Sequence, residues 1–483
     1  MDAMDGMFIH PCDDDQILVA ADTGDIELLQ RLRNETGDDE TFRRKCEYVR
    51  GLEGLTCLHL SAGSGNTAIC RFLIDKVKLD INIKNDRGDS PLIFAALKGQ
   101  FDAANFFILR GADVKSSGYK GTTCLHIAAE KGNKEIMQLL LSRGADIEAQ
   151  SVSGTPLQCA ALCGNIESVG FLLFHGANPN SVSPLSVSPL MGSISSHSYE
   201  CFELLLEAGA DPNISSCGSS PLALAAREND TCFLRPLLAA GANPNSCTTD
   251  LLGPIEHAAE VGNFEGVTIL FPVTENIVSC YPDWSVRGIK DHHHSEAYKI
   301  EKNLRRDGYF QFVYEEGKNA AKEKDYSEAV KWFSEGIYLQ PNNETLLSNR
   351  SICWENLDEP NFSLHDAEAC VMLKPDWPKG HYRAGVAWML LKHYMKACGS
   401  FKTASLLDPD NMEIKRALSL AFKSAILGQA EKNLPNTVYL LASLVPFCPA
   451  FYMTLLNMAK ENSTEAMRVL REFLESSDLV RLL

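Results

Sequence analysis

The side chains in this sequence best suited to binding chemistry are two cations four residues apart, Lys379 and Arg383. Residues four apart on a helix share one face, so both charges can reach the same ligand. A carboxylate is recognised by charge-assisted donors, which Lys, Arg and Asn side chains supply, and Asn349 adds a third donor. These three side chains together offer suitable donors to a carboxylate. A plainer interpretation stays open, in which Asn349 caps a local backbone group and the two cations form a solvated helix face.

These residues lie in a stretch, Gly317 to Asn411, that repeats every 34 residues. A helix-stopping proline and two small residues recur in each row, and a proline cannot continue a helix. A period of this length with these columns predicts two antiparallel helices per repeat, which the small residues allow to approach closely. The recurring columns are Pro341, Pro375 and Pro409; Gly317, Ser351 and Gly385; and Ala329, Ser363 and Ala397. The stretch resembles the tetratricopeptide repeat (TPR).

Two segments of these rows resemble the carboxylate-clamp TPR domains of co-chaperones, which grip the acidic C-terminal peptide of cytosolic heat-shock chaperones. They read LeuSerAsnArg, ending at Arg350, and LysProAspTrpProLysGlyHisTyrArg, ending at Arg383. The resemblance implies that Asn349, Lys379 and Arg383 stand at clamp positions.

The first repeat departs from the clamp pattern. Where the family has a Lys and an Asn, this sequence has Tyr314 and Lys318. Lys318 keeps a donor at the second position, whereas Tyr314 removes a charge from the first. We call Lys318, Asn349, Lys379 and Arg383 the clamp residues.

A second repeat occupies the preceding part of the chain. Its anchor, Thr/Ser-x-Leu, is followed by an Ala-rich helix, a turn and a Leu-rich helix that most often ends in GlyAlaAsp or GlyAlaAsn. The anchors begin at Thr56, Ser90, Thr123, Thr155, Ser188 and Ser220, with a weak seventh at Gly253. This is the ankyrin pattern, in which the Thr or Ser caps the first helix and the final Gly takes the left-handed C-terminal position.

Within this pattern we expect His59 and His126 to bond between neighbouring turns, as structural and not catalytic residues. The segment Gln16 to Leu32 is expected to cap the stack as a half repeat. The fifth repeat has MetGlySerIleSerSer where Ala-rich sequence is usual, so its first helix should be weak. Arg87, Tyr119 and Lys120 precede their anchors, at hairpin tips that often meet partners, although a solvated turn is the alternative for each.

Between the two repeat regions lies a segment of mixed charge with three consecutive histidines, His292, His293 and His294. Three adjacent side chains cannot converge on one metal from regular structure, and no recognisable ligand spacing accompanies them. We therefore expect a solvated linker and no metal site.

Composition narrows the function further. The 483-residue chain carries a formal net charge of −18, which opposes general binding to nucleic-acid phosphates. Its 16 cysteines lack paired spacing, so buried thiols in a reducing compartment are expected. The N-terminus has no apolar secretory leader, so we do not expect secretion. No nucleotide-binding, metalloprotease or hydrolase motif occurs, so we expect neither an enzyme nor a cofactor. We predict a cytoplasmic protein, with the nucleus as an alternative.

The end of the chain has two features. The apolar run Val438 to Leu456 approaches the length of a membrane span but contains Pro446 and Pro449. We interpret it as a soluble helical pair, with membrane association as the alternative. A final amphipathic helix beginning near Asn462 should pack back on the TPR stack.

The sequence thus predicts an all-α chain: an ankyrin-repeat solenoid at residues 14–271, a linker at 272–307, three TPR repeats at 308–411, and a capping helix with a C-terminal helical segment at 412–483. This combination resembles the ankyrin–TPR proteins found especially in plants. The resemblance implies a non-catalytic adaptor that holds one protein on its ankyrin surface and an acidic C-terminal peptide, such as a chaperone tail, in its TPR groove. The alternatives are a scaffold or regulatory subunit of a phosphatase or ubiquitin-ligase complex, an enzyme without a recognisable motif, and a membrane-recruited protein.

Overall fold

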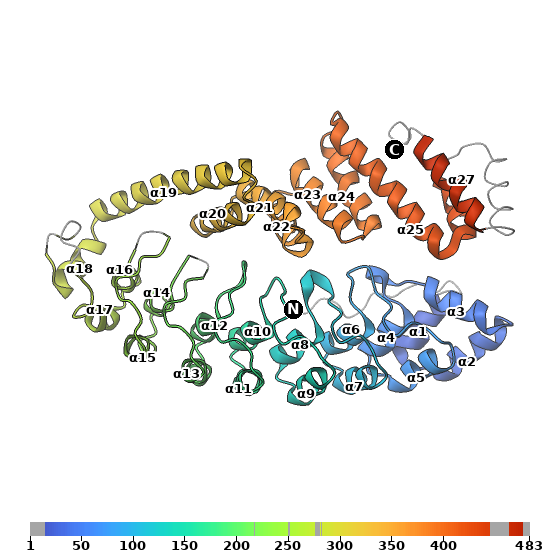
Figure 1. The fold of residues 1–483 in the computed structure, drawn as a ribbon, viewed down its shortest axis with the longest axis horizontal. Helices are drawn as coiled ribbons and strands as arrows, with labels where there is room; N and C mark the ends of the chain where they lie inside the picture. The colour runs from blue at the N-terminus through green and yellow to red at the C-terminus, as the bar shows by residue number, and fades with distance from the viewer. Residues whose placement is uncertain are drawn as a thin grey trace. The chain divides into compact units, whose positions relative to one another are not determined.

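The computed structural model describes residues 15–216, 218–249, 252–275, 281, 283–444 and 463–476 (Figure 1). Across these ranges the chain forms helices and a few isolated β-bridges, and no strand. It divides into two compact units, Met1–Val313 and Tyr314–Leu483, with the division inside one helix, α19 (Glu296–Lys322). The predicted all-helical class is confirmed, and each unit is described by itself.

Unit 1 begins with α1 (Asp15–Thr23), α2 (Ile26–Glu35), α3 (Asp39–Tyr48) and the short turn η1 (Leu52–Gly54). Helix pairs follow in chain order: α4 (Cys57–Gly63) with α5 (Thr67–Asp75), α6 (Pro91–Leu97) with α7 (Phe101–Leu109), α8 (Cys124–Lys131) with α9 (Lys134–Ser142), α10 (Pro156–Leu162) with α11 (Ile166–Phe174), α12 (Pro189–Ser195) with α13 (Tyr199–Glu207), α14 (Pro221–Arg227) with α15 (Leu234–Ala239), and α16 (Pro254–Glu260) with α17 (Phe264–Leu270). The turn η2 (Tyr119–Gly121) precedes α8, and α18 (Val286–His293) precedes α19.

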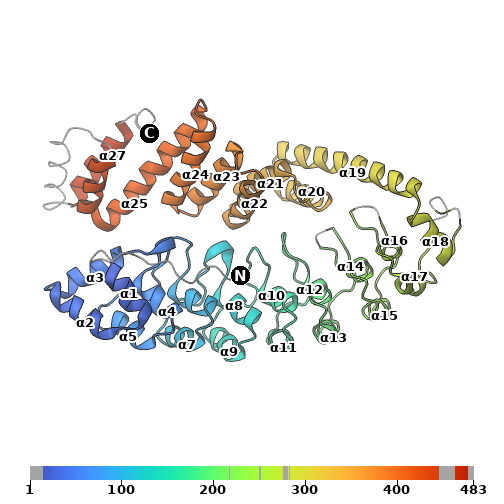
Figure 2. The same ribbon diagram turned by 180° about the vertical axis from the view of Figure 1, so that it is seen from behind.

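The first and second helices of these pairs form two layers. Each first helix contacts the first helix of the next repeat, and most second helices do the same, as Figures 1 and 2 show from opposite sides. The anchor residue begins the first helix, because its side chain accepts a backbone N–H bond, as Ser90 does from Ile93. One continuous apolar core runs through the unit, from Ile17 to Ile289.

Histidines join neighbouring repeats as predicted. His59 contacts Thr56 through Nδ1 (2.8 Å to Oγ1) and the carbonyl oxygen of Asp89, in the next repeat, through Nε2 (3.0 Å). His126 repeats this with the carbonyl of Gly154, at 2.9 Å. In the following repeat Gln158 takes the same place, accepting from the Thr155 N–H and donating to the Val187 carbonyl at 2.6 Å.

A ladder of side-chain amides adds a second link between repeats. The Asn82 Oδ1 atom accepts from the backbone N–H of Asp113 at 2.8 Å. The same bond recurs from Asp211 to Asn180 and from Asn243 to Asn213, each at 2.7 Å, and from Glu275 to Asn245 at 2.8 Å. Each asparagine therefore holds the start of the next repeat's loop in register.

Two details of unit 1 differ from the sequence analysis or extend it. The N-terminal segment contains α1 and α2 as predicted, but also α3, which the sequence did not indicate because its short, highly charged stretch lacks the repeat pattern. The fifth repeat's first helix forms despite its unusual sequence: α12 is capped by Ser188, and Ser193 is buried with its hydroxyl donating to the Leu190 carbonyl at 2.7 Å.

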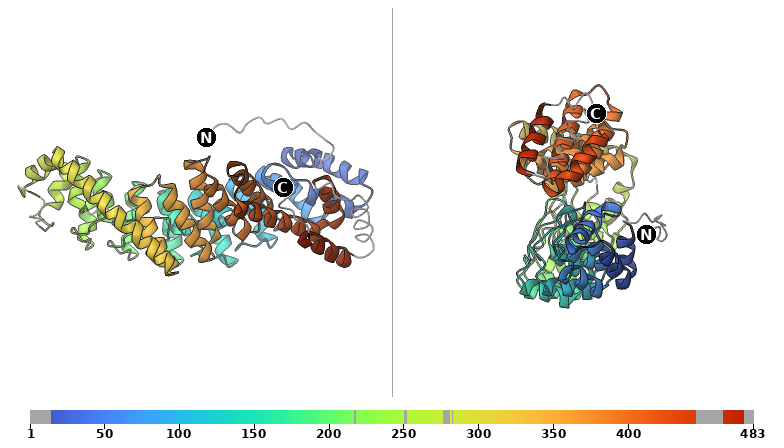
Figure 3. Two further views of the ribbon diagram at one scale, coloured as in Figure 1. Left: turned by 90° about the horizontal axis from the view of Figure 1, so that it is seen from above. Right: turned by 90° about the vertical axis from the view of Figure 1, so that its right-hand side faces the viewer.

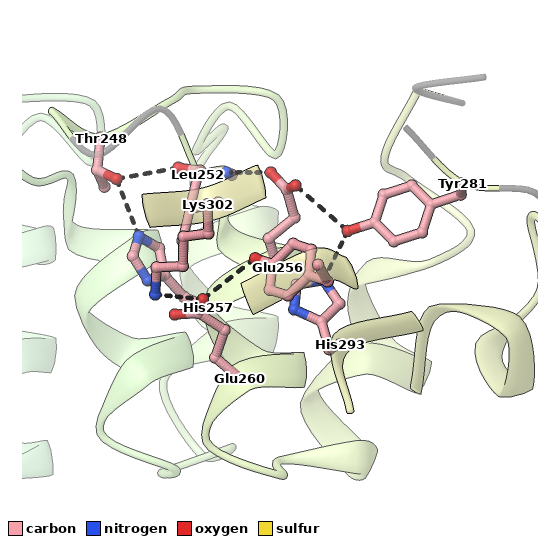
Figure 4. A network of polar contacts seen from close by, with 10 residues as sticks. Thr248, Leu252, Glu256, His257, Glu260, Tyr281, His293 and Lys302 are labelled. Atoms are coloured by element: carbon pink, nitrogen blue, oxygen red, sulfur yellow. Dashed lines mark hydrogen bonds and ion pairs between the residues drawn. The ribbon is translucent and has the colours of Figure 1, made fainter. Parts of the chain in front are cut away.

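The expectation of a solvated linker is wrong for Tyr281, α18 and the start of α19, which pack on the last ankyrin pair (Figure 4). The buried Tyr281 hydroxyl donates to Glu256 (3.2 Å) and contacts His293 Nε2 (2.7 Å). Tyr298 donates to Glu260 at 3.1 Å, and Lys302 forms an ion pair with the same carboxylate. This packing could not be predicted from the sequence, because these aromatic and titratable side chains are spaced without a repeat.

Burial shifts the pKa values of two of these side chains, Glu256 and His293. Burial raises the pKa of the Glu256 carboxyl and lowers that of His293 to about 3. His293 therefore stays neutral near pH 7 and serves as a hydrogen-bonding core residue, which explains part of the histidine run without a metal. No grouping of metal-binding side chains occurs among the described residues.

In its described residues unit 2 contains the end of α19 and seven further helices, visible also from other directions in Figure 3. These are α20 (Tyr326–Leu339), α21 (Glu344–Asn356), α22 (Pro360–Leu373), α23 (Pro378–Leu390), α24 (Tyr394–Leu407) and α25 (Met412–Leu444), followed by α27 (Ser463–Ser476). Helices α20, α22 and α24 each end two residues before one of the recurring prolines, as the period predicts.

The small residues of the repeat lie where paired helices touch. A side chain added at Gly317 would meet the Phe333 ring at 2.7 Å, and one added at Gly385 would meet the Phe401 ring at 2.5 Å. In the middle repeat the Ser351 hydroxyl contacts the Ser363 hydroxyl at 2.9 Å. The predicted close approach is confirmed in all three pairs.

The C-terminal part agrees only partly with prediction. The predicted capping helix is α25, which continues to Leu444 because Pro435 within it removes one backbone bond without ending the helix. Helix α27 contacts α25 with Leu470 and Leu474 buried, as predicted. The run Val438 to Leu456 lies beyond the described residues from 445 onward, and none of the described helices combines the length and apolarity needed to span a membrane.

The repeat-bridging histidines predict an acid-sensitive ankyrin unit. Burial lowers the pKa of His126 to about 4, from 6.5, so between these values the unfolded chain binds more protons than the folded one. The contribution of His126 to the free energy of unfolding is then fully present above about pH 6.5. It falls by about 1.4 kcal/mol per pH unit as the pH is lowered toward 4. His126→Gln should preserve the bonds, as Gln158 does, and reduce the loss.

The measurement is urea unfolding followed by circular dichroism at about pH 7 and about pH 5. The variant should lose less stability than the wild type between the two conditions. Equal losses in both proteins would contradict a neutral, repeat-bridging His126.

Candidate functional site

The site predicted from sequence rests on α21 and α23, which contact each other. A buried ion pair fixes α21 against its neighbours. Arg350 donates from Nε and Nη2 to both Asp366 oxygens, at 2.8 and 2.7 Å, and from Nη1 to the Ser334 hydroxyl at 2.9 Å. The side chains of Arg350 and Asp366 are 6% and 0% exposed. Asn349, next in the chain to Arg350, is thereby held in place and is half-buried.

Lys379 and Arg383 lie close together on α23, as the four-residue spacing predicts. Burial lowers the pKa of the Lys379 amine, and the charge of Arg383 lowers it further. The ammonium is 5.8 Å from the centre of the Trp377 ring and has no carboxylate partner among the described residues. The structure therefore keeps a partly desolvated cation beside a second one.

Arg383 has an acidic neighbour that the sequence analysis missed. Its Nη1 atom donates to Glu355 Oε2, on α21, at 3.2 Å. The two side chains are only 17% and 14% exposed. No short-range spacing reveals this contact, because the residues lie 28 positions apart on different helices.

Lys318 stands apart from this pair. It lies on α19, is exposed, and forms an ion pair with Glu315 at 2.9 Å, while its ammonium is 5.1 Å from the Tyr314 ring centre. The hydrogen bond from Lys318 to Glu315 raises the pKa of this amine. In this arrangement Lys318 already has a carboxylate partner, so a ligand would compete with Glu315 for it.

The three ankyrin finger residues, by contrast, converge. The guanidinium of Arg87 and the ammonium of Lys120 lie 5.3 and 5.0 Å from the centre of the Tyr119 ring. Arg87 also pairs with Glu53 of the preceding finger, at 2.5 Å. We call Arg87, Tyr119 and Lys120 the finger cluster, a cationic and aromatic surface formed by neighbouring loops.

Several thiols of the described residues have raised pKa values. The Cys232 thiol donates to Asp230, which also contacts His197 at 3.3 Å. Burial and this carboxylate raise the pKa of Cys232 to about 11, so its thiol is protonated near neutral pH and is a poor nucleophile. Burial likewise raises the pKa of Cys124 and Cys353 to about 12.

Comparison with known proteins agrees with both repeat types. A family model described as ankyrin repeats (3 copies) matches residues 17–118 and 109–183. The chain contains ankyrin repeats. The chain is also similar to proteins named Hsp70-Hsp90 organizing proteins, as the clamp resemblance led us to expect.

Three of these relatives illustrate the similarity. Hsp70-Hsp90 organizing protein 3 of Arabidopsis thaliana is 36% identical over 124 residues, which are 25% of this chain and 22% of the relative. Protein STIP1 homolog of Dictyostelium discoideum is 39% identical over 103 residues (21% and 18%). Heat shock protein STI1 of Saccharomyces cerevisiae is 33% identical over 124 residues (26% and 21%). The chain spans about a fifth of the length of these relatives.

The buried pair below the site yields a stability prediction. Asp366→Asn should cost about 3–5 kcal/mol locally, because it leaves the Arg350 charge buried without its partner. Hydrogen exchange should become faster in the backbone of α21 and α22. The matched control is Asp376→Asn, which removes an exposed carboxylate of the same unit. Unchanged protection of α21 in Asp366→Asn would contradict the role assigned to this pair.

Proposed function

We propose that this protein is a non-catalytic adaptor whose unit 2 binds an acidic C-terminal peptide through the clamp residues. The observation that carries the proposal is the cation pair on α23. Lys379 and Arg383 are held near each other and partly desolvated, and each then raises the cost of the other's charge. An anionic ligand offsets that cost, which is the physical basis of a carboxylate-binding site.

Asn349 complements the pair. Asn349 is half-buried and lies on α21, which contacts α23. An amide N–H and two cations together offer several donors to the two oxygens of a terminal carboxylate. Because Arg350 is locked by Asp366, the helix that carries Asn349 is ordered before a ligand arrives.

The chemical class of the peptide follows from the relatives. Several are named Hsp70-Hsp90 organizing proteins, so we propose the acidic C-terminus of such a chaperone as the ligand. The departures in the first repeat, Tyr314 and the Glu315-paired Lys318, act against affinity. The alternative is a scaffold whose unit 2 binds a different peptide.

On unit 1 we propose that the finger cluster contacts a second protein. Arginine and tyrosine are enriched among the residues that dominate binding energy at protein interfaces. The two cations close to the Tyr119 ring favour an acidic partner surface. Adaptor action would then consist of holding this partner and a chaperone tail on one chain.

The test is calorimetric titration of the full chain with an acidic chaperone C-terminal peptide. Lys379→Ala and Arg383→Ala should each weaken binding by roughly 10- to 100-fold, because each removes a charged hydrogen bond of about 1.5–3 kcal/mol. Lys402→Ala is the matched control, since it removes an exposed lysine on α24, and it should bind as the wild type does.

The same peptide with an amidated C-terminus should bind weakly to every variant. Binding that is insensitive to amidation, or to both α23 substitutions, would contradict the clamp and favour the scaffold with another peptide ligand.

A further inference from the structure

In the structure, a clamp residue already has a carboxylate partner: Arg383 is paired with Glu355. This carboxylate comes from the protein itself, and it reaches the guanidinium of a clamp residue at 3.2 Å. The contact is monodentate: Arg383 Nη1 donates to Glu355 Oε2. A guanidinium and a carboxylate pair most favourably through two parallel hydrogen bonds, which are not formed here.

The remaining atoms of this pair are left unsatisfied. Arg383 Nε and Glu355 Oε1 are both buried and have no hydrogen-bond partner in the described part of the chain. A buried donor or acceptor without a partner carries a desolvation cost. The contrast with Arg350, which bonds both oxygens of Asp366 at 2.7 and 2.8 Å, shows that this unit builds fully paired ions elsewhere.

The direction of the Glu355 pKa shift indicates that Arg383 offsets only part of the cost of burying this carboxylate. Burial raises the pKa of the Glu355 carboxyl even though Arg383 acts in the opposite direction. The pairing thus offsets only part of the cost of burying this charge, so replacing Glu355 by a better-placed carboxylate is energetically accessible.

We propose that Glu355 is an internal counter-charge that occupies Arg383 in the free protein and is displaced by the carboxylate of an acidic peptide. The proposal rests on the proposed function and adds a specificity determinant to it. A ligand must outcompete the resident carboxylate for Arg383, so weakly anionic peptides are rejected and Lys379, which has no resident carboxylate, makes the first contact.

The experiment compares wild-type full chain with Glu355→Gln by calorimetry, using one acidic peptide with a free C-terminal carboxylate. Glutamine keeps the shape and removes the charge, so Arg383 becomes available and affinity should rise about tenfold. Glu323→Gln is the matched control, because it removes the same charge from an exposed position of the same unit. It should leave affinity unchanged.

A second comparison tests the route through Arg383. In an Arg383→Gln background, Glu355→Gln should give no gain in affinity, because the group it releases is gone. Circular dichroism melting of each variant shows whether the fold is retained.

The outcomes separate the two proposals. A gain that requires Arg383 supports the counter-charge, as does binding that appears only in Glu355→Gln. Equal wild-type and Glu355→Gln affinities overturn the counter-charge alone, and so does a gain that persists without Arg383 or that Glu323→Gln reproduces. No binding to either protein overturns the clamp and the counter-charge together.

Discussion

Each repeat of this protein can bury its apolar residues only against the next repeat, and this constraint governs everything built on the chain. In unit 1 the helices are too short to be stable alone, so the repeats are joined by apolar packing and by polar bonds that cross each interface. His59 and His126 span one such boundary each, and amides such as Asn213 fix the loops. The finger cluster inherits its geometry from this register, because its three side chains come from successive loops.

In unit 2 the neighbouring helices are held together by close packing at small residues and by a buried ion pair. Its helices are longer and approach closely at Gly317 and Gly385, and one buried ion pair, Arg350 with Asp366, ties α21 to α22. Burying a full charge pair is expensive unless both groups are well bonded, and here the bidentate geometry meets that condition. The consequence is a rigid helix beneath Asn349, so the candidate site depends on an interaction with no direct part in binding.

Features that depend on residues close together in the sequence were predicted, whereas features that depend on contacts between distant residues were not. Repeat type, helix ends and the shared face of Lys379 and Arg383 depend on local spacing, and the sequence predicted them. The burial of Tyr281 and α18 was not predicted, because these residues follow no period and are buried through contacts with α16 that arise only in three dimensions. Glu355 was missed for the same reason: a carboxylate in an acidic chain becomes informative only when the fold brings it to Arg383.

The charge balance of the chain argues for short-range recognition. With a formal net charge of −18, the whole protein repels an acidic peptide at long range, although salt at physiological strength screens exposed charges beyond about 8 Å. Attraction must then come from cations that are partly buried and poorly screened, which describes Lys379 and Arg383 better than the exposed Lys318. Burial strengthens a contact with a ligand, but it also makes an unpaired charge costly while the site is empty. Glu355 reduces that cost for Arg383, and the same contact makes the site selective, because only a carboxylate placed well enough to replace Glu355 gains the full benefit of the arginine.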